Sequence, residues 1–168
     1  MPVSVSIHQM TTEDVGRLSL FAMGHVTEEH YFVDSWDEQQ EERRVVLVAE
    51  LDGSIAGYVH YNRRPKYQPF RSLQIPEIQD LYVDHKFRRM GIGRALIAAC
   101  EDLARADGIQ EIGIGVGVGS NFGNAQKLYV GLGFVPDGAG AVFERAPISV
   151  GEVRPVDDRL CLMMFKSL

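Results

Sequence analysis

Apolar and polar residues alternate in several short segments of the chain, and this period of two is typical of strands with one buried face. The most regular case is residues 109–118, where four apolar residues alternate with glycines: Ile112, Ile114, Val116 and Val118 with Gly113, Gly115, Gly117 and Gly119. The alternation predicts a strand with one apolar face and one face of bare backbone. Two interpretations of the bare face stay open: a ligand approaches it closely, or neighbouring helices pack tightly against it.

Further strands are predicted wherever the same alternation, or a short apolar run, is bounded by turn residues. They cover residues 3–8, 45–50, 55–61, 77–83 and 159–166, and one more begins at residue 134. The Asp52-Gly53 pair joins the second of these strands to the third, and this dipeptide favours a two-residue hairpin turn.

Apolar positions three or four residues apart predict the helices. The strongest pattern covers residues 91–107, where Cys100 falls on the apolar face, so we assign it to the core and not to catalysis. Other helices are expected after Thr12, before Arg44 and over residues 121–131. Residues 63–76 contain three prolines and predict an irregular connection. Hairpin strands early in the chain and strand–helix–strand units later favour a mixed sheet with helices on both faces.

Composition and charge narrow the class of protein. The length of 168 residues predicts one domain over residues 1–168, and 17 Lys and Arg against 23 Asp and Glu give a net charge of −6. Non-specific nucleic-acid binders usually carry the opposite charge. No apolar run approaches the roughly 18 residues of a membrane span, and no secretory signal is visible. Because Cys100 and Cys161 lack metal-binding spacing, we expect a cytoplasmic protein with reduced thiols and no metal. The charge and the short apolar runs predict neither nucleic acid nor membrane as a partner.

Residues 88–94 combine arginine with glycine between a predicted strand and a predicted helix. Gly91 and Gly93 leave backbone N–H groups uncovered at a helix N-terminus, where a phosphate binds favourably. An ordinary basic turn is the alternative interpretation. Two nucleotide-binding motifs do not match, because Leu96 stands where the dinucleotide fingerprint needs its third glycine, and the chain has no P-loop Gly-Lys-Ser/Thr.

Three segments resemble the GNAT family of N-acetyltransferases, whose members use acetyl-coenzyme A. Arg88-x-x-Gly91-x-Gly93 resembles the family signature Arg/Gln-x-x-Gly-x-Gly/Ala. Residues 124–134 are similar to the family's Asn-x-x-Ala/Leu-Tyr-x-x-x-Gly-Phe segment, and residues 157–168 to its usual last strand. The strong motifs cover residues 77–134. The resemblance implies an α/β fold with a central mixed, mostly antiparallel sheet of six to seven strands and helices on both faces.

The resemblance also implies that acetyl-coenzyme A is the cosubstrate, and that a primary amine of a small molecule or peptide attacks it directly in a ternary complex. In the family the pyrophosphate lies on main-chain N–H groups of the glycine loop, and the pantetheine arm pairs with the preceding strand. The matching positions here are Leu81, Tyr82, Val83, Arg88, Arg89, Met90, Gly91, Ile92, Gly93, Arg94, Asn124 and Tyr129. Asn124 has a second interpretation, as a cap of the helix that starts there.

Three side chains are candidates for catalysis by the same resemblance. Tyr129 matches the family tyrosine that protonates the departing thiolate. A phenol with a pKa of about 10 can donate a proton at neutral pH, so the role is chemically feasible. Packing in the core is the alternative interpretation of Tyr129. Glu77 matches the glutamate base of histone-acetyltransferase-like members. Asp80 competes with Glu77, since residues three apart on a regular strand face opposite sides unless a bulge intervenes. A water chain in place of a single base is a further alternative.

The acceptor side is assigned from the polar and aromatic segment between the first two helices. Acidic and aromatic residues there can hold an ammonium group by charge and by cation–π contact. The candidates are Glu28, Glu29, His30, Tyr31, Phe32, Asp34 and Trp36, and the selected substrate contacts are Glu29, Tyr31 and Trp36. His25 and His30 have no partners at metal-ligand spacing. A solvated acidic helix end is the alternative for this segment.

Other functions stay open beside acetyl transfer. A non-catalytic acyl-coenzyme A sensor on the same fold would bind the cosubstrate and release no thiol. An interaction domain would use the glycine-rich strand for packing alone, and an enzyme transferring succinyl or propionyl would keep the same residues. Dimers are common in the family, so a homodimer is compatible with the sequence.

Overall fold

The computed structural model describes residues 4–168, so the strand prediction for residue 3 lies outside the described part. These residues divide into two compact units: residues up to 63 with residues 79–102, and residues 64–78 with residues 103–168. Strand β4 (Glu77–Val83) and helix α4 (Ile92–Ala106) each contribute residues to both units. The assignment of residues 1–168 to a single domain stays a prediction.

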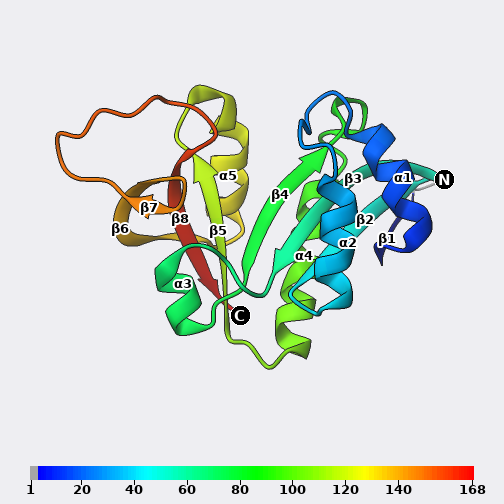
Figure 1. Cartoon of the computed structure of the whole chain (residues 1–168), viewed down its shortest axis with the longest axis horizontal. Coiled ribbons are helices and arrows are strands. Elements are labelled where there is room, and N and C mark those ends of the chain that lie inside the picture. Colours follow the sequence, from blue (N-terminus) through cyan, green and yellow to red (C-terminus); the bar gives the residue numbers. More distant parts are fainter. Residues whose placement is uncertain (1–3) are drawn as a thin grey trace. The chain divides into compact units, whose positions relative to one another are not determined.

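The first unit pairs its strands as antiparallel neighbours. Its elements are β1 (Val5–Gln9), α1 (Thr12–Phe21), α2 (Tyr31–Gln40), β2 (Arg44–Leu51), β3 (Ser54–Asn62), most of β4, the 3-10 helix η1 (His85–Phe87) and the first part of α4. β2 pairs with β1 and with β3, and Val46 of β2 stands opposite His60 of β3. Helices α1 and α2 lie on one face of these strands and α4 lies on the other (Figure 1).

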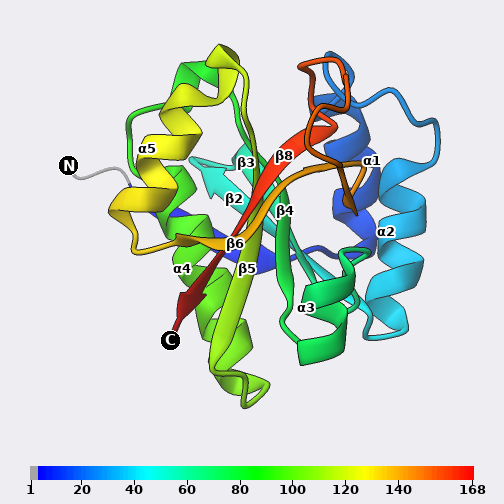
Figure 2. The same ribbon diagram turned by 90° about the vertical axis from the view of Figure 1, so that its left-hand side faces the viewer.

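The second unit is built around a glycine-rich strand. Its elements are the first residues of β4, α3 (Gln68–Leu73), the end of α4, β5 (Glu111–Gly117), the 3-10 helix η2 (Ser120–Phe122), α5 (Gly123–Gly131), β6 (Val135–Phe143), β7 (Ala146–Pro147) and β8 (Leu160–Ser167). β8 lies antiparallel between β5 and β6, and the start of β4 pairs with β5 in parallel. Helices α3 and α5 lie on opposite sides of β5 and β8 (Figure 2).

The strands follow the order β1-β2-β3-β4-β5-β8-β6-β7, and the pairing of β4 with β5 is parallel while the other described ladders are antiparallel. The prediction of an α/β fold with a mixed, mostly antiparallel sheet is therefore confirmed. The described residues form eight strands, not six to seven, because β6 turns back at Glu144 and Arg145 into the two-residue strand β7. Neither α3 nor this hairpin was expected from the sequence.

Local sequence signals explain where several elements begin and end. The backbone N–H of Thr11 donates to the carboxylate of Asp14 at 2.9 Å, which satisfies a donor at the start of α1. Asp52 and Gly53 both have positive φ, 49° and 80°, as the hairpin between β2 and β3 requires. Gly108 has a φ of 74° directly after α4, as expected of a residue that ends a helix.

Each unit has its own buried apolar cluster. In the first unit, residues from α1, α2, β2 and β3 form it: Met10, Leu18, Ala22, Phe32, Val46, Val48, Ile55 and Tyr58. In the second, the cluster comprises Tyr67, Phe70, Ile75, Val142, Cys161 and Met163. Cys100 is fully buried, and burial raises its pKa, so its assignment to the core is confirmed. No helix among residues 4–168 is long and apolar enough to cross a membrane.

Side chains of the second unit cover the glycine face of β5. The ring of Phe70 lies against Gly113, the guanidinium of Arg145 against Gly115, and the ring of Phe122 against Gly117, each within the space that a Cβ atom would need. On the opposite face, Ile112, Ile114 and Val116 are buried. Of the two interpretations of the bare face, the structure supports close packing. The packing groups are aromatic rings and one guanidinium.

Candidate functional site

The glycine loop, residues 88–94, comprises the connection from η1 to α4 and the first three residues of α4, and it is mostly exposed. Arg89 and Gly91 have positive φ, 62° and 81°, so the backbone turns sharply before the helix. The carbonyl of Gly91 accepts the N–H of Ala95 at 3.0 Å, which makes Gly91 the start of the helical hydrogen bonding. The N–H groups of the first helical turn have no carbonyl partner within the helix. Together with the helix dipole, they can bind an anion such as a phosphate group.

The arginine side chains of the loop have different surroundings. The Nε of Arg88 donates to the carbonyl oxygen of Val83 at 3.0 Å, so this side chain ties the loop to the end of β4. Arg89 and Arg94 are exposed. Met90 is also exposed, whereas Ile92 is buried and anchors the helix. The main chain of the loop, and not the fork of Arg88, is therefore the part available to an anion.

Strand β3 and the segment after helix α1 hold residues Leu81–Val83 of β4, the segment predicted to pair with the pantetheine arm. The N–H of Asp84 donates to the carbonyl of Ala56 at 2.9 Å. The ring of Tyr82 stacks on the ring of His25 with a centroid distance of 3.6 Å. Gly57 of β3 lies so close to β4 that a Cβ atom there would stand 2.5 Å from the carbonyl oxygen of Tyr82.

Gly57→Ala is expected to lower the free energy of unfolding by about 1–3 kcal/mol, because the added methyl group meets backbone that cannot rotate away. Gly16→Ala is the matched control, since a Cβ at Gly16 in α1 has nothing within 4 Å. It should be neutral or stabilising by about 0.5–1 kcal/mol. Urea unfolding of both variants measures the difference, and equal stability would contradict the tight approach of β3 to β4.

Asp80 and Glu77, the two candidate bases on β4, have opposite environments. Asp80 has a φ of 51°, which breaks the regular strand, and its side chain is exposed. The Tyr31 hydroxyl donates a hydrogen bond to its Oδ2 atom. Glu77 is fully buried; its Oε1 accepts a hydrogen bond from the Nε of Arg145 at 3.0 Å and lies 2.8 Å from Nη2 of the same guanidinium in an ion pair. Asp80 is thus the carboxylate that a dissolved amine can reach.

The segment between α1 and α2, with residues of both helices, lines a partly open surface cavity of about 300 Å³ in the first unit. Its walls combine apolar side chains with two acids: Ser19, Leu20, Ala22, Met23, Val26, Thr27, Glu28, Glu29, Tyr31 and Phe32. Four acceptor-side candidates, Glu28, Glu29, Tyr31 and Phe32, are thereby brought together. Trp36 packs against the core cluster of the first unit instead, and neither it nor His30 nor Asp34 lines the cavity. The apolar walls from α1 were not foreseen, because exposed aliphatic residues are common on any surface.

Tyr129 and Asn124 belong to α5 in the second unit. Tyr129 is buried beside Phe134, with a ring-centroid distance of 6.2 Å, and burial raises its pKa to about 12. The phenol therefore keeps its proton at neutral pH, as an acid requires. Asn124 is exposed at the second residue of α5, whose N-cap is Phe122, so the capping interpretation of Asn124 is wrong.

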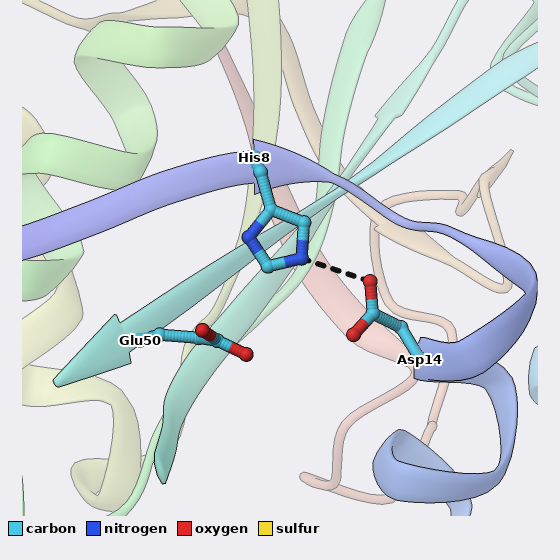
Figure 3. Close-up of side chains that lie close together, drawn as sticks. All are labelled: His8, Asp14 and Glu50. Atoms are coloured by element: carbon cyan, nitrogen blue, oxygen red, sulfur yellow. Dashed lines mark hydrogen bonds and ion pairs between the residues drawn. The ribbon is translucent and has the colours of Figure 1, made fainter. Parts of the chain in front are cut away.

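A cluster of His8, Asp14 and Glu50 has ligand atoms within 4.8 Å of one another (Figure 3). Arg17 supplies the positive charge at this cluster, with its Nη1 at 2.8 Å from Asp14 and 2.6 Å from Glu50. Burial acts to raise the pKa of Asp14, but the hydrogen bonds with Thr11 and His8 together outweigh burial, so the pKa of Asp14 lies below its usual value. The cluster is therefore an ion-pair network that fixes α1 to β1 and β2.

The model of the Acetyltransferase (GNAT) family matches residues 11–134, and the chain belongs to this family. Its members use acetyl-coenzyme A. Comparison with curated proteins found no significant match.

Many solved structures share this fold, and the three described next are distant in sequence. A ribosomal-protein-alanine N-acetyltransferase from Brucella melitensis is 22% identical with a TM-score of 0.72, over 97% of this chain and 99% of that one. An IAA acetyltransferase from Bacillus cereus is 19% identical with a TM-score of 0.67, over 98% and 100%. The PaiA N-acetyltransferase from Thermoplasma acidophilum, in complex with coenzyme A, is 16% identical with a TM-score of 0.63, over 98% and 99%. At these identities the likeness establishes the fold.

Proposed function

We propose that the protein is an acetyl-coenzyme A-dependent N-acetyltransferase that acetylates a primary amine of a small molecule or peptide by direct attack. The observation that carries the proposal is the exposed glycine loop, with positive φ at Arg89 and Gly91, between the end of β4 and α4. The loop fits a diphosphate, because a Cβ at Gly91 has nothing within 4 Å and Arg88 is tied back to Val83. Bound acetyl-coenzyme A supplies an acyl group activated as a thioester.

Residues of the protein bind the cosubstrate, remove a proton from the acceptor amine and protonate the leaving thiolate. The main chain of residues 89–94 holds the pyrophosphate, and the main chain of residues 81–83 pairs with the pantetheine arm. Asp80 attracts the acceptor's ammonium group and takes its proton, which frees the nitrogen lone pair to form the C–N bond. Tyr129 gives its proton to the sulfur as the C–S bond breaks. The nitrogen loses its second proton to solvent as the amide forms, and solvent reprotonates the Tyr129 phenolate. Asp80 is preferred to Glu77 because Glu77 is buried and held by Arg145.

The acidic cavity supports an acceptor that carries a positive charge. Glu28 and Glu29 face it beside the aromatic rings of Tyr31 and Phe32, and these groups attract an ammonium ion by charge and by cation–π contact. Apolar walls from Leu20, Met23 and Val26 suit the aliphatic part of such an amine. The proposed acceptor is therefore a primary amine on an aliphatic chain, free or within a peptide.

Isothermal titration with acetyl-coenzyme A and a thiol-release screen over polyamines, amino acids and peptides test the proposal. We expect binding, and thiol release with at least one aliphatic amine. The absence of binding at millimolar protein and ligand would refute the assignment, and binding without thiol release from any amine would support the non-catalytic sensor instead. Gly91→Glu should weaken binding about tenfold more than Gly91→Ala, because both variants share the strain of positive φ and only one adds a negative charge at the loop.

A further inference from the structure

Four polar side chains of the first unit form a continuous hydrogen-bonded chain that ends at Asp80. The Nη1 of Arg44 lies 3.1 Å from the Nδ1 of His60, and the Nε2 of His60 lies 3.2 Å from the hydroxyl oxygen of Tyr31. The Tyr31 hydroxyl in turn contacts Oδ2 of Asp80. The four residues come from β2, β3, α2 and β4 respectively (Figure 1).

The Arg44 guanidinium fixes the direction of every hydrogen bond in this series of four side chains. A guanidinium group only donates, so the Nδ1 of His60 must accept from Arg44. The ring proton of the neutral imidazole therefore sits on Nε2 and is donated to the Tyr31 oxygen. The hydroxyl hydrogen of Tyr31 is then directed to Asp80. Only one arrangement of protons satisfies all three contacts.

Burial keeps both middle members of the chain neutral. His60 is fully buried, and burial lowers its pKa to about 3, with Asp80 acting to raise it and Arg44 to lower it. Burial, together with Asp80, raises the pKa of Tyr31. The pKa of neighbouring Tyr58 is raised by burial and by the charges of Asp80, Tyr82 and Glu28. The four hydrogen-bonded side chains therefore keep their proton arrangement throughout the neutral pH range.

Arg44, at the opposite end of the hydrogen-bonded series from Asp80, is also held by its neighbours. The Nε of Arg44 donates to Oε2 of Glu38 at 2.7 Å, and its Nη1 also donates to Oε1 of Gln79 at 3.2 Å. The Nδ2 of Asn62 donates to the same Gln79 oxygen at 3.2 Å. Arg44 is thus fixed by groups from α2 and β4 and cannot swing away from His60.

We propose that Arg44, His60 and Tyr31 are positioning residues that hold one carboxylate oxygen of Asp80 and so present its other oxygen to the acceptor amine. Within residues 4–168, Oδ1 of Asp80 has no hydrogen-bond partner. An exposed carboxylate rotates among several rotamers unless a neighbour fixes it. Tyr31 fixes this one from the wall of the acidic cavity, so the amine and the carboxylate meet in one geometry. The role in acetyl transfer rests on the proposed function.

The proton arrangement of His60 can be measured without any activity. In nitrogen-15 spectra of histidine-labelled wild-type protein, we expect one neutral histidine with its proton on Nε2 that does not titrate between pH 5 and 9. Comparison with His60→Gln assigns the signal among the five histidines. A proton on Nδ1, or titration of His60 near pH 6.5, would overturn the proposal whatever the protein catalyses.

Three variants separate positioning from stability. His60→Leu removes both hydrogen bonds of the ring, and we expect kcat/KM for the amine to fall about tenfold through kcat, with KM for acetyl-coenzyme A unchanged. His60→Gln keeps an acceptor and a donor and should recover activity to within about threefold of the wild type. Val46→Ala, directly opposite His60 on β2, is the control for a weakened core at the same place and should keep full kcat/KM.

Equal kcat/KM in His60→Leu and Val46→Ala would refute the positioning role. Recovery by His60→Gln would support it, and a His60→Gln variant as impaired as His60→Leu would count against it. If the wild type binds acetyl-coenzyme A but acetylates no amine, the proposed function fails and the role in acetylation fails with it. The spectra then still decide whether the chain of hydrogen bonds exists.

Discussion

Asp80→Asn is expected to lower kcat/KM for the amine acceptor by about 10²–10³-fold, while binding of acetyl-coenzyme A stays unchanged. Asparagine keeps the size of the side chain, and its amide oxygen can still accept the hydrogen bond from Tyr31. It carries no charge to attract an ammonium group, and it cannot take a proton. A loss of this size is typical when a general base is removed. Steady-state thiol release and calorimetry, measured on the same preparation, provide the two values.

Glu77→Gln is the matched control, because it makes the same chemical change three residues earlier on β4. Glu77 is fully buried and bonded to Arg145, so its neutralisation should reduce stability and leave kcat/KM of the folded protein within severalfold of the wild type. The comparison is made well below the unfolding temperature of both variants. A larger catalytic loss in Glu77→Gln than in Asp80→Asn would reverse the assignment of the base.

Strong periodicity made parts of the fold predictable. β4 has the bounds Glu77–Val83 that its sequence predicts, and α4 differs from the predicted helix by one residue at each end. Helix α3 was missed because proline disfavours helix interiors. In the structure, Pro69 stands in the first turn of α3, where its missing N–H costs nothing.

The hairpin of β6 and β7 has no comparable signal in the sequence. Its segment is rich in glycine and mostly exposed, so neither alternation nor an apolar run marks it. Glu144 and Arg145 turn the chain with positive φ, 51° and 67°, at positions without glycine. The buried ion pair of Arg145 with Glu77 can favour this conformation, and such a contact between residues 68 apart is invisible to local patterns.

The candidate site was predictable only where it rests on local sequence patterns. The glycine loop and the competition between Glu77 and Asp80 follow from short motifs and from the period of a strand. The hydrogen bonds that link Arg44, His60 and Tyr31 to Asp80 join residues 16 to 49 positions apart in the sequence, so they depend on tertiary packing. One signal was present: His60 lies within a strand segment of mostly apolar residues, and a buried polar group needs partners.

The second large effect is expected from Arg145→Met, which should lower the free energy of unfolding by about 3–5 kcal/mol. The Arg145 side chain lies mostly buried over Gly115, and it forms a hydrogen bond through Nε and an ion pair through Nη2 with the fully buried Glu77. Methionine fills much of the same space but leaves the Glu77 carboxylate without the guanidinium that neutralises it. Urea unfolding at pH 7 measures the loss.

Arg154→Met is the matched control from the same unit. Arg154 is more exposed, pairs with Glu152 at 2.6 Å and lies over the ring of Phe143, so its replacement should cost less than about 1 kcal/mol. The double variant Glu77→Gln with Arg145→Met should be more stable than Arg145→Met alone, because the buried charge is removed together with its partner. If the double variant is less stable than Arg145→Met, the destabilisation comes from lost packing against Gly115, and the ion pair is not its cause.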